Sequence, residues 1–266
     1  MISSSTINSD KKKILYLEGL NKNFGGLQAV SELTLSLGQD ELKGLIGPNG
    51  AGKSTLFNLI SGLHKPNGGR VLMDGADITG KTPDVIVQKG IARTFQSVKL
   101  LENKTVLETM MTSFFLSYEY HFFDVIFKTR RYIKQEKEFR ESAIKYLAWL
   151  GVDHLRDKNC NELAYGLQRK VSIAMTLCLK PRVLLLDEPM AGLTHKEKED
   201  LIETILKLKE QFKLSIILVE HDMKVIMNLC ETIAVMNQGR LIAEGAREEI
   251  RTNTEVIEAY LGTSAI

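Results

Sequence analysis

Gly47-Pro48-Asn49-Gly50-Ala51-Gly52-Lys53-Ser54-Thr55 fits the phosphate-binding pattern G-x-x-x-x-G-K-[ST] at every position. An apolar run with strand character, Leu42–Ile46, precedes it, and Leu56–Ile60 continues it as a helix. The three glycines let the backbone turn tightly and point successive N–H groups at phosphate oxygens. The N-terminal end of the following helix adds to the attraction for an anion. A glycine-rich surface turn is the structural alternative, but it does not explain Lys53 and Ser54 at the helix start.

This segment predicts a nucleotide phosphate site with a metal ion. Lys53 is expected to reach the β- and γ-phosphates, and the Ser54 hydroxyl is expected to hold Mg²⁺. The residues predicted to bind the phosphates are Gly47, Pro48, Asn49, Gly50, Ala51, Gly52, Lys53, Ser54 and Thr55.

Two carboxylates follow a second apolar run, Val183–Leu186, which is typical of a parallel strand buried on both faces. Asp187 and Glu188 therefore stand at the carboxyl end of a strand, where open α/β sheets bind ligands. Asp187 is predicted to hold the Mg²⁺ shell, and Glu188 is the candidate base that polarises the attacking water. The alternative is an acidic strand end that caps the next helix.

Composition places the chain among globular proteins. Of its 266 residues, 44% are hydrophobic and 26% charged, and the net charge of +2 gives no reason to expect nucleic-acid binding. Cys160, Cys178 and Cys230 are scattered and form no metal or disulfide pattern, so they are expected to be buried in a reducing cytoplasm. Residues 1–13 lack the apolar centre of a signal peptide, and no apolar stretch approaches the ~20 residues of a membrane span.

The chain reads as α/β at both ends with a helical middle from about residue 101 to 157. Expected strands are Ile14–Leu20, Val71–Met73 and Ser215–Val219. Lys196–Phe212 is expected to form an amphipathic helix, and Thr232–Glu244 a hairpin that turns at Asn237-Gln238-Gly239.

With both motifs in place, residues 14–262 resemble the ATP-binding subunits of ABC transporters. Phe24 stands where that family places an aromatic ring against adenine, and Gln96 where it places a glutamine that touches Mg²⁺ and water. His221 matches the histidine that contacts the γ-phosphate. Taken alone, Phe24 would more simply be a core aromatic, Gln96 a loop residue and His221 a surface histidine. The order and spacing of the three favour the functional roles. Leu163, Ala164, Tyr165, Gly166, Leu167 and Gln168 occupy the place of the family's signature L-S-G-G-Q.

The resemblance implies a fold and a domain plan. The fold expected is α/β, with a RecA-like P-loop NTPase core, an inserted α-helical subdomain at about 97–178 and an antiparallel β subdomain. Residues 14–262 would form one ABC ATPase domain, 1–13 a disordered polar tail and 263–266 a C-terminal tail.

The resemblance also implies a mechanism with ATP and Mg²⁺ as ligands. Two subunits would close head-to-tail on ATP, each presenting residues 163–168 to the nucleotide of the other. Glu188 would then activate water while His221 and Lys53 stabilise charge on the γ-phosphoryl group. Metal contacts would come from Ser54, Gln96 and Asp187.

Three departures from the family pattern concern this dimer. Ala164 replaces a serine whose hydroxyl reaches the γ-phosphate, Leu167 replaces a glutamine, and Thr194 replaces an aspartate. A hydrogen bond to a charged group contributes about 1.5–3 kcal/mol, so Ala164 should weaken the closed pair unless backbone N–H groups compensate. We therefore hypothesise an asymmetric pair of two different ATPase subunits.

The middle segment carries two further features. One is an aromatic cluster of Phe114, Phe115, Tyr118, Tyr120, Phe122, Phe123 and Phe127. It either packs the helical subdomain against itself or lines a groove for a permease helix. The other is the basic run of Lys128, Arg130, Arg131 and Lys134. It is either a solvated face or lies near anionic lipid headgroups.

Within the family, the chain resembles the ATP-binding subunits of branched-chain amino-acid importers. The segments that carry this resemblance are Gly90–Gln96, Leu163–Gly166, Glu220–Met223 and Glu258–Gly262. The resemblance implies integral-membrane permease subunits, a second ATPase subunit or a second copy of this chain, an extracytoplasmic binding protein, and a location at the cytoplasmic face of the membrane.

Other functions remain open at this point. Urea, amide and lipopolysaccharide-export ATPases share much of the same pattern. An ABC-type translation factor would carry two cassettes, whereas this chain has one phosphate loop. A DNA-repair ATPase would insert sustained heptads between Gln96 and Leu163, and none are present.

Overall fold

The structure is a computed structural model that describes residues 12–94, 100–101, 103–117 and 122–261. The chain divides into two compact units. Unit 1 is Met1–Arg93, Arg182–Glu188 and Lys209–Ile266, and unit 2 is Thr94–Pro181 and Pro189–Leu208. The predicted tails lie outside the described residues except for positions 12 and 13, and strand β1 begins at Lys13.

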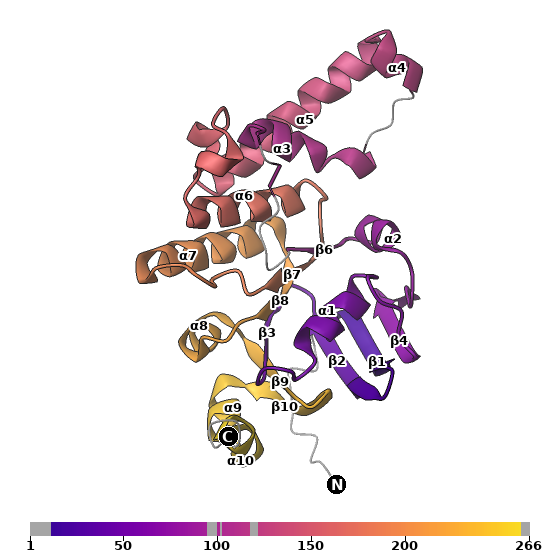
Figure 1. Cartoon of the computed structure of the whole chain (residues 1–266), viewed down its shortest axis with the longest axis vertical. Helices are drawn as coiled ribbons and strands as arrows, with labels where there is room; N and C mark the ends of the chain where they lie inside the picture. The colour runs from indigo at the N-terminus through magenta and orange to yellow at the C-terminus, as the bar shows by residue number, and fades with distance from the viewer. Residues whose placement is uncertain (1–11, 95–99, 102, 118–121, 262–266) are drawn as a thin grey trace. The chain divides into compact units, whose positions relative to one another are not determined.

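Unit 1 contains two sheets (Figure 1). The first is antiparallel, in the order β2 (Leu27–Gly38), β1 (Lys13–Phe24), β4 (Gly68–Met73) and β5 (Ala76–Asp77). The predicted strand Ile14–Leu20 is confirmed but extends further, because β1 keeps pairing with β2 down to Phe24 and Leu27 at the hairpin end.

The second sheet has six strands and positions most of the predicted site. Adjacent strands are parallel from β9 through to β6, and β10 pairs with β9 as an antiparallel hairpin. The order is β10 (Arg240–Ala246), β9 (Thr232–Asn237), β3 (Leu42–Ile46), β8 (Ser215–Val219), β7 (Val183–Asp187) and β6 (Ile91–Arg93). The apolar runs predicted as buried strands are confirmed, since every residue of β3, β7 and β8 is buried.

One hydrophobic core joins the two sheets of unit 1. Helix α1 (Lys53–Ile60) contributes Leu56, Phe57, Leu59 and Ile60 to it, alongside buried side chains from both sheets. The remaining helices of unit 1 are α2 (Pro83–Gln88), α8 (Met223–Leu229), α9 (Arg247–Thr252) and α10 (Thr254–Leu261). Burying this much apolar surface is the main source of stability for such a unit.

Lys43 is a charged residue within the otherwise apolar, buried strand β3. Its ammonium pairs with the carboxylates of Glu244 and Glu41, the latter at 3.5 Å, and the side chain is almost fully buried. Thr232 donates a hydrogen bond to Glu41. A charge at this depth is tolerated because partners of opposite sign surround it.

Unit 2 is helical. Its main helices are α3 (Val106–Thr112), α4 (Phe122–Ile126), α5 (Arg130–Trp149), α6 (Tyr165–Leu177) and α7 (His195–Phe212), the last of which continues into unit 1 after Leu208. Single 3₁₀ turns lie at Phe115–Ser117, Asp153–Leu155 and Cys160–Glu162. Helices α3, α5 and α6 pack against one another. The predicted helix Lys196–Phe212 is confirmed, with Leu201, Ile205 and Leu208 buried.

Cys160, Cys178 and Cys230 are all buried, as predicted, and are free thiols. Across the part of the chain that the structure describes, no helix combines the length and apolar character that a membrane crossing requires.

Candidate nucleotide site

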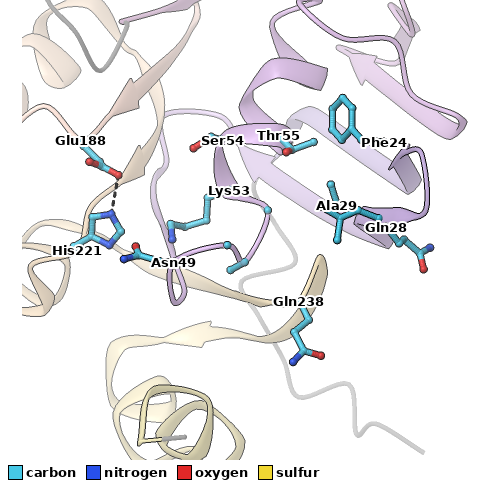
Figure 2. A pocket seen from close by; sticks show the side chains of 14 residues that line it. Phe24, Gln28, Ala29, Asn49, Lys53, Ser54, Thr55, Glu188, His221 and Gln238 are labelled. Atoms are coloured by element: carbon cyan, nitrogen blue, oxygen red, sulfur yellow. Dashed lines mark hydrogen bonds and ion pairs between the residues drawn. The ribbon is translucent and has the colours of Figure 1, made fainter. Parts of the chain in front are cut away.

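A pocket of roughly 650 Å³ lies in unit 1 around the predicted phosphate loop (Figure 2). It brings together the loop, Phe24, Glu188 and His221, which were all predicted from the sequence. The residues that line it are Phe24, Leu27, Gln28, Ala29, Asn49, Gly50, Ala51, Gly52, Lys53, Ser54, Thr55, Glu188, His221 and Gln238.

The phosphate loop runs from β3 into α1, whose first turn has no side-chain cap, while the backbone N–H of Gly47 at the start of the loop bonds the Tyr260 side chain. Gly52 is the N-cap of α1, has φ 99° and makes no side-chain capping hydrogen bond. A Cβ at Gly52 would lie 2.4 Å from the Ala29 carbonyl oxygen, so this position requires glycine. Gly239 N donates to Ala51 O over 3.0 Å and ties the loop to the β9–β10 hairpin. A helix start with free N–H groups is a favourable place for a phosphate.

Lys53 lies across its own loop. Its ammonium donates to Gly47 O over 2.6 Å and to Pro48 O over 3.1 Å, and the side chain is largely buried. Burial lowers the pKa of Lys53, while the nearby charges of Glu188 and Asp187 raise it. The ammonium is therefore held close to two carboxylates at the mouth of the loop, where an anion would strengthen its charged form.

Glu188 and His221 follow neighbouring parallel strands. Asp187 at the end of β7 pairs in register with Val219 at the end of β8, so the next residues of both strands emerge at one edge. His221 Nε2 lies 2.7 Å from Glu188 Oε1 (Figure 2). Glu188 has a left-handed backbone (φ 46°), and its N–H donates to Val219 O over 3.0 Å. A carboxylate fixed in this way at a pocket wall is suited to orienting water.

Asp187 makes a contact that the sequence did not predict. Its Oδ2 accepts a hydrogen bond from Arg93 Nη2 over 2.7 Å, and both side chains are nearly buried. Arg93 Nη1 also donates to Asn58 Oδ1 on α1 over 2.6 Å. The guanidinium thus links β6, β7 and α1, the helix that follows the phosphate loop. Gln96, a further predicted metal ligand, lies outside the described residues.

Phe24 stands at the end of the β1–β2 hairpin and is 43% exposed. Its ring packs edge-on against His64, with centroids 5.3 Å apart and planes at 72°. Lys22 Nζ lies 5.0 Å from the ring centroid. A partly exposed ring held in this way can stack on a planar base.

Residues 163–168 belong to unit 2 and begin helix α6. Ala164 is the N-cap and provides no side-chain hydrogen bond. Gln168 Nε2 donates to Leu163 O over 2.9 Å, and Tyr165 accepts a hydrogen bond from Arg169 Nη2 over 2.7 Å. Thr194, also in unit 2, donates from Oγ1 to Glu197 Oε2 over 2.7 Å and accepts from Glu197 N over 3.4 Å in the first turn of α7. The start of α6 therefore presents backbone N–H groups, and Ala164 adds no serine hydroxyl to them.

Sequence reasoning missed several residues at this site. Gln28 and Gln238 line the pocket from two hairpins, and Arg93 holds Asp187. The hairpin expected at Thr232–Glu244 is confirmed, but nothing in its pattern indicated that the turn residue Gln238 reaches the pocket.

Comparison with known protein families agrees with this geometry. Residues 30–191 match the family model described as ABC transporter. Residues 240–266 match the one described as Branched-chain amino acid ATP-binding cassette transporter.

Individual relatives cover nearly the whole chain. The high-affinity branched-chain amino acid transport ATP-binding protein BraF of Pseudomonas aeruginosa is 39% identical over 251 residues, which is 94% of this chain and 98% of BraF. The corresponding LivG protein of Escherichia coli is 39% identical over 249 residues, again 94% of this chain and 98% of LivG.

Solved structures show the same architecture. A nucleotide-free ATP-binding cassette from an ABC transporter superposes with a TM-score of 0.82 at 33% identity, covering 94% of this chain and 99% of that one. The ADP conformation of such a cassette gives a TM-score of 0.81 at 32% identity. With its phosphate loop, its paired carboxylates and these relatives, the chain belongs to the ATP-binding subunits of the ABC transporter family.

Proposed function

We propose that this chain is the ATP-hydrolysing motor subunit of an importer for branched-chain amino acids. The observation that supports the motor role best is the Glu188–His221 contact at 2.7 Å in the pocket that also holds Lys53 and the phosphate loop. The cargo assignment is supported by the match at residues 240–266 and by the BraF and LivG relatives.

ATP would bind with its phosphates on residues 47–55 and its base against Phe24. The donor set fits Mg²⁺, which uses one or two protein oxygens together with substrate phosphates and water. Ser54 has an exposed hydroxyl in the pocket, and Asp187 ends β7 immediately before the pocket residue Glu188. Gln96 would be the third ligand. When bound, Mg²⁺ neutralises charge that develops on the phosphate oxygens.

Hydrolysis would use three side chains of this pocket. Glu188 would polarise the attacking water, and the imidazole of His221 would hold that carboxylate in place and contact the γ-phosphoryl group. Lys53, which donates to Gly47 O and Pro48 O, would turn its ammonium toward the phosphate oxygens. Charge stabilisation of this kind is the largest part of catalysis in phosphoryl transfer.

A second ATPase subunit would complete each site by presenting its own signature segment. In this chain, the segment 163–168 would offer the backbone N–H groups at the start of α6, because Ala164 has no hydroxyl. Together with Leu167 and Thr194, this favours a pair of different ATPase subunits over a pair of identical ones. Permease subunits and, indirectly, an extracytoplasmic binding protein would complete the importer at the cytoplasmic face of the membrane.

For the domain plan, we propose a single ABC domain over residues 14–262 with an inserted helical subdomain at about 97–178. The compact helical unit of Thr94–Pro181 supports this boundary, and it is joined by Pro189–Leu208.

The first experiment is affinity purification of this chain from its native membranes in mild detergent, with mass spectrometry of the co-purifying chains. Two polytopic permeases and a second ATPase subunit are expected. Recovery with an export permease, with a urea or amide importer, with ribosomes or without any membrane protein would contradict the assignment.

The second experiment tests the motor. The reconstituted complex should take up leucine with ATP hydrolysis, and Glu188→Gln should retain ATP binding while turnover falls by about 10²–10⁴-fold. Unchanged turnover in this variant would remove Glu188 from its role.

A further inference from the structure

Exposed apolar side chains gather at the turn between α4 and α5 in unit 2. Phe123 and Phe127 are 69% and 73% exposed, and Ile126 and Ile133 are more than half exposed. We call residues 123–134 the α4–α5 turn. Single exposed apolar residues are common on protein surfaces, but several large ones within one short segment indicate an interaction surface.

Hydrogen bonds fix the backbone of this turn. Phe127 N donates to Phe123 O over 3.0 Å, and Thr129 N donates to Asp124 O over 3.1 Å. Thr129 Oγ1 donates to Asp124 Oδ1 over 2.7 Å and also accepts from Tyr132 N at the start of α5. The aromatic rings are therefore carried by an ordered corner, and the carboxylate of Asp124 is used within it.

The turn stands away from the packed part of unit 2. The buried residues of α5, Ala143 and Leu147, lie in the last third of its twenty residues. Phe139 stacks on the buried Phe114, with ring centroids 4.6 Å apart. It lies nine positions after Arg130, the first residue of α5, or about 13 Å along the helix. Figure 1 shows α4 at the N-terminal end of α5, away from α6. The corner is thus placed to meet something outside the unit.

The charge of the α4–α5 turn indicates what kind of partner it binds. Residues 122–134 contain one acidic side chain, Asp124, and four basic ones, which gives 4 − 1 = +3. Lys128, Arg130, Arg131 and Lys134 are all exposed. Aromatic and aliphatic side chains beside several cations are the composition of segments that lie in the interface of an anionic bilayer. A protein groove would need several matching acidic groups around its apolar floor.

We propose that the α4–α5 turn binds the surface of an anionic lipid bilayer. Phe123, Ile126 and Phe127 enter the interfacial region, and the surrounding lysines and arginines contact lipid phosphates. The proposal rests on the proposed function only for the presence of a membrane next to this subunit. It gives the ATPase a lipid contact of its own, in addition to any contact with permeases.

The test is flotation of the purified full-length chain with vesicles. Binding is expected to vesicles of phosphatidylcholine with phosphatidylglycerol, to be weaker with phosphatidylcholine alone, and to fall as salt is raised. Phe123→Ser with Phe127→Ser should reduce the partition coefficient about tenfold or more. Each of Lys128→Gln and Arg130→Gln should reduce it about fivefold on anionic vesicles.

Matched controls separate the turn from general stickiness. Leu206→Ser removes an apolar side chain of α7 that is 43% exposed, and Lys145→Gln removes an exposed charge from α5 itself. Both should bind like the unchanged chain. Equal losses in these controls, equal binding to neutral vesicles, or no binding to either vesicle would overturn the proposal.

A second readout locates the contact. Trp149 is the single tryptophan, so Phe123→Trp in a Trp149→Phe background reports on the turn alone. Its emission should shift to the blue and be quenched by brominated lipids. Binding only to vesicles that contain the permeases, without quenching, would assign the turn to a protein partner instead. ATPase activity and permease recovery, measured on the same preparations, test the proposed function separately.

Discussion

Arg93 and Asp187 form a nearly buried ion pair, with Nη2 and Oδ2 2.7 Å apart and side-chain exposures of 9% and 5%. The two residues lie at the ends of the neighbouring parallel strands β6 and β7, where Arg93 pairs in register with Leu185. Asp187 is the proposed Mg²⁺ ligand, so the guanidinium sets the position of a carboxylate next to the pocket. We therefore propose that Arg93 positions this carboxylate for the nucleotide site.

Replacing Arg93 with methionine should destabilise unit 1, because it leaves the Asp187 carboxylate buried without its guanidinium. Breaking one side of a buried pair costs about 3–5 kcal/mol. We expect a loss of about 3 kcal/mol in the free energy of unfolding measured with urea, and a higher Mg²⁺ concentration for half-maximal ATPase activity.

The control for this variant is Arg70→Met. Arg70 pairs with Glu18 over 2.6 Å, but both side chains are exposed, at 58% and 42%. Surface pairs of this kind contribute less than about 1 kcal/mol. Equal losses in the two variants would show that burial of the Arg93–Asp187 pair has no special importance.

The contact between His221 and Glu188 predicts coupled kinetic effects. His221→Ala should lower kcat by about 10²-fold or more and change the KM for ATP little, because it removes a partner of the base and a contact to the γ-phosphoryl group. In the Glu188→Gln background, the same change should add almost nothing, since residues that act together are not additive.

Steady-state kinetics of both single variants and the double variant would measure this coupling. His195→Ala provides the histidine control, because the His195 side chain is 91% exposed and contacts Glu199 at the surface of unit 2. Fully multiplicative losses in the His221/Glu188 double variant would indicate that the two side chains act independently.

Two glycines of the phosphate loop should respond differently to alanine. Both have positive φ, 99° at Gly52 and 80° at Gly50, and left-handed backbone costs a residue with a Cβ about 1–2 kcal/mol. At Gly52 the added Cβ would also lie 2.4 Å from Ala29 O, whereas at Gly50 it would meet nothing within 4 Å. Urea unfolding should therefore show a clearly larger loss for Gly52→Ala. Similar losses would mean that the β2 backbone moves aside.

Local patterns predicted much of this site, and long-range pairing accounts for what they missed. The phosphate loop and the strands β3, β7 and β8 could be recognised because their residues are consecutive and their periodicity is strong. The contact of Arg93 with Asp187 joins residues 94 positions apart, and it depends on the sheet order, which places β6 beside β7. No spacing rule in the sequence contains that order.

The middle segment shows the same limit. Aromatic side chains there were expected either to pack inside the helical subdomain or to line a groove. Phe114 packs inside, while Phe115, Phe123 and Phe127 are exposed; Tyr118 and Tyr120 lie outside the described residues. Neighbours of identical type thus differ in burial, because only the helix packing decides which ring faces inward.

The buried thiols predict a stability change at alkaline pH. Burial raises the pKa of Cys178 from its ordinary value of 9.0 to about 12, and burial raises the pKa of Cys230 as well. Between pH 9.0 and about pH 12, the unfolded chain has already lost the Cys178 proton while the folded chain keeps it. The folded state then binds more protons, so the free energy of unfolding falls as pH rises.

The contribution of Cys178 is fully retained below about pH 9 and decreases through about pH 12. At about pH 10, one unit above the ordinary pKa, ionisation of this thiol in the unfolded chain should lower the free energy of unfolding by about 1.4 kcal/mol. One pKa unit corresponds to 1.36 kcal/mol. Urea unfolding of the unchanged chain and of Cys178→Ala at about pH 8 and about pH 10 would measure it. The variant should lose less stability between the two pH values, because it has no thiol at position 178 to ionise in the unfolded chain. An identical loss would show that the Cys178 thiol ionises in the folded chain as readily as in the unfolded one.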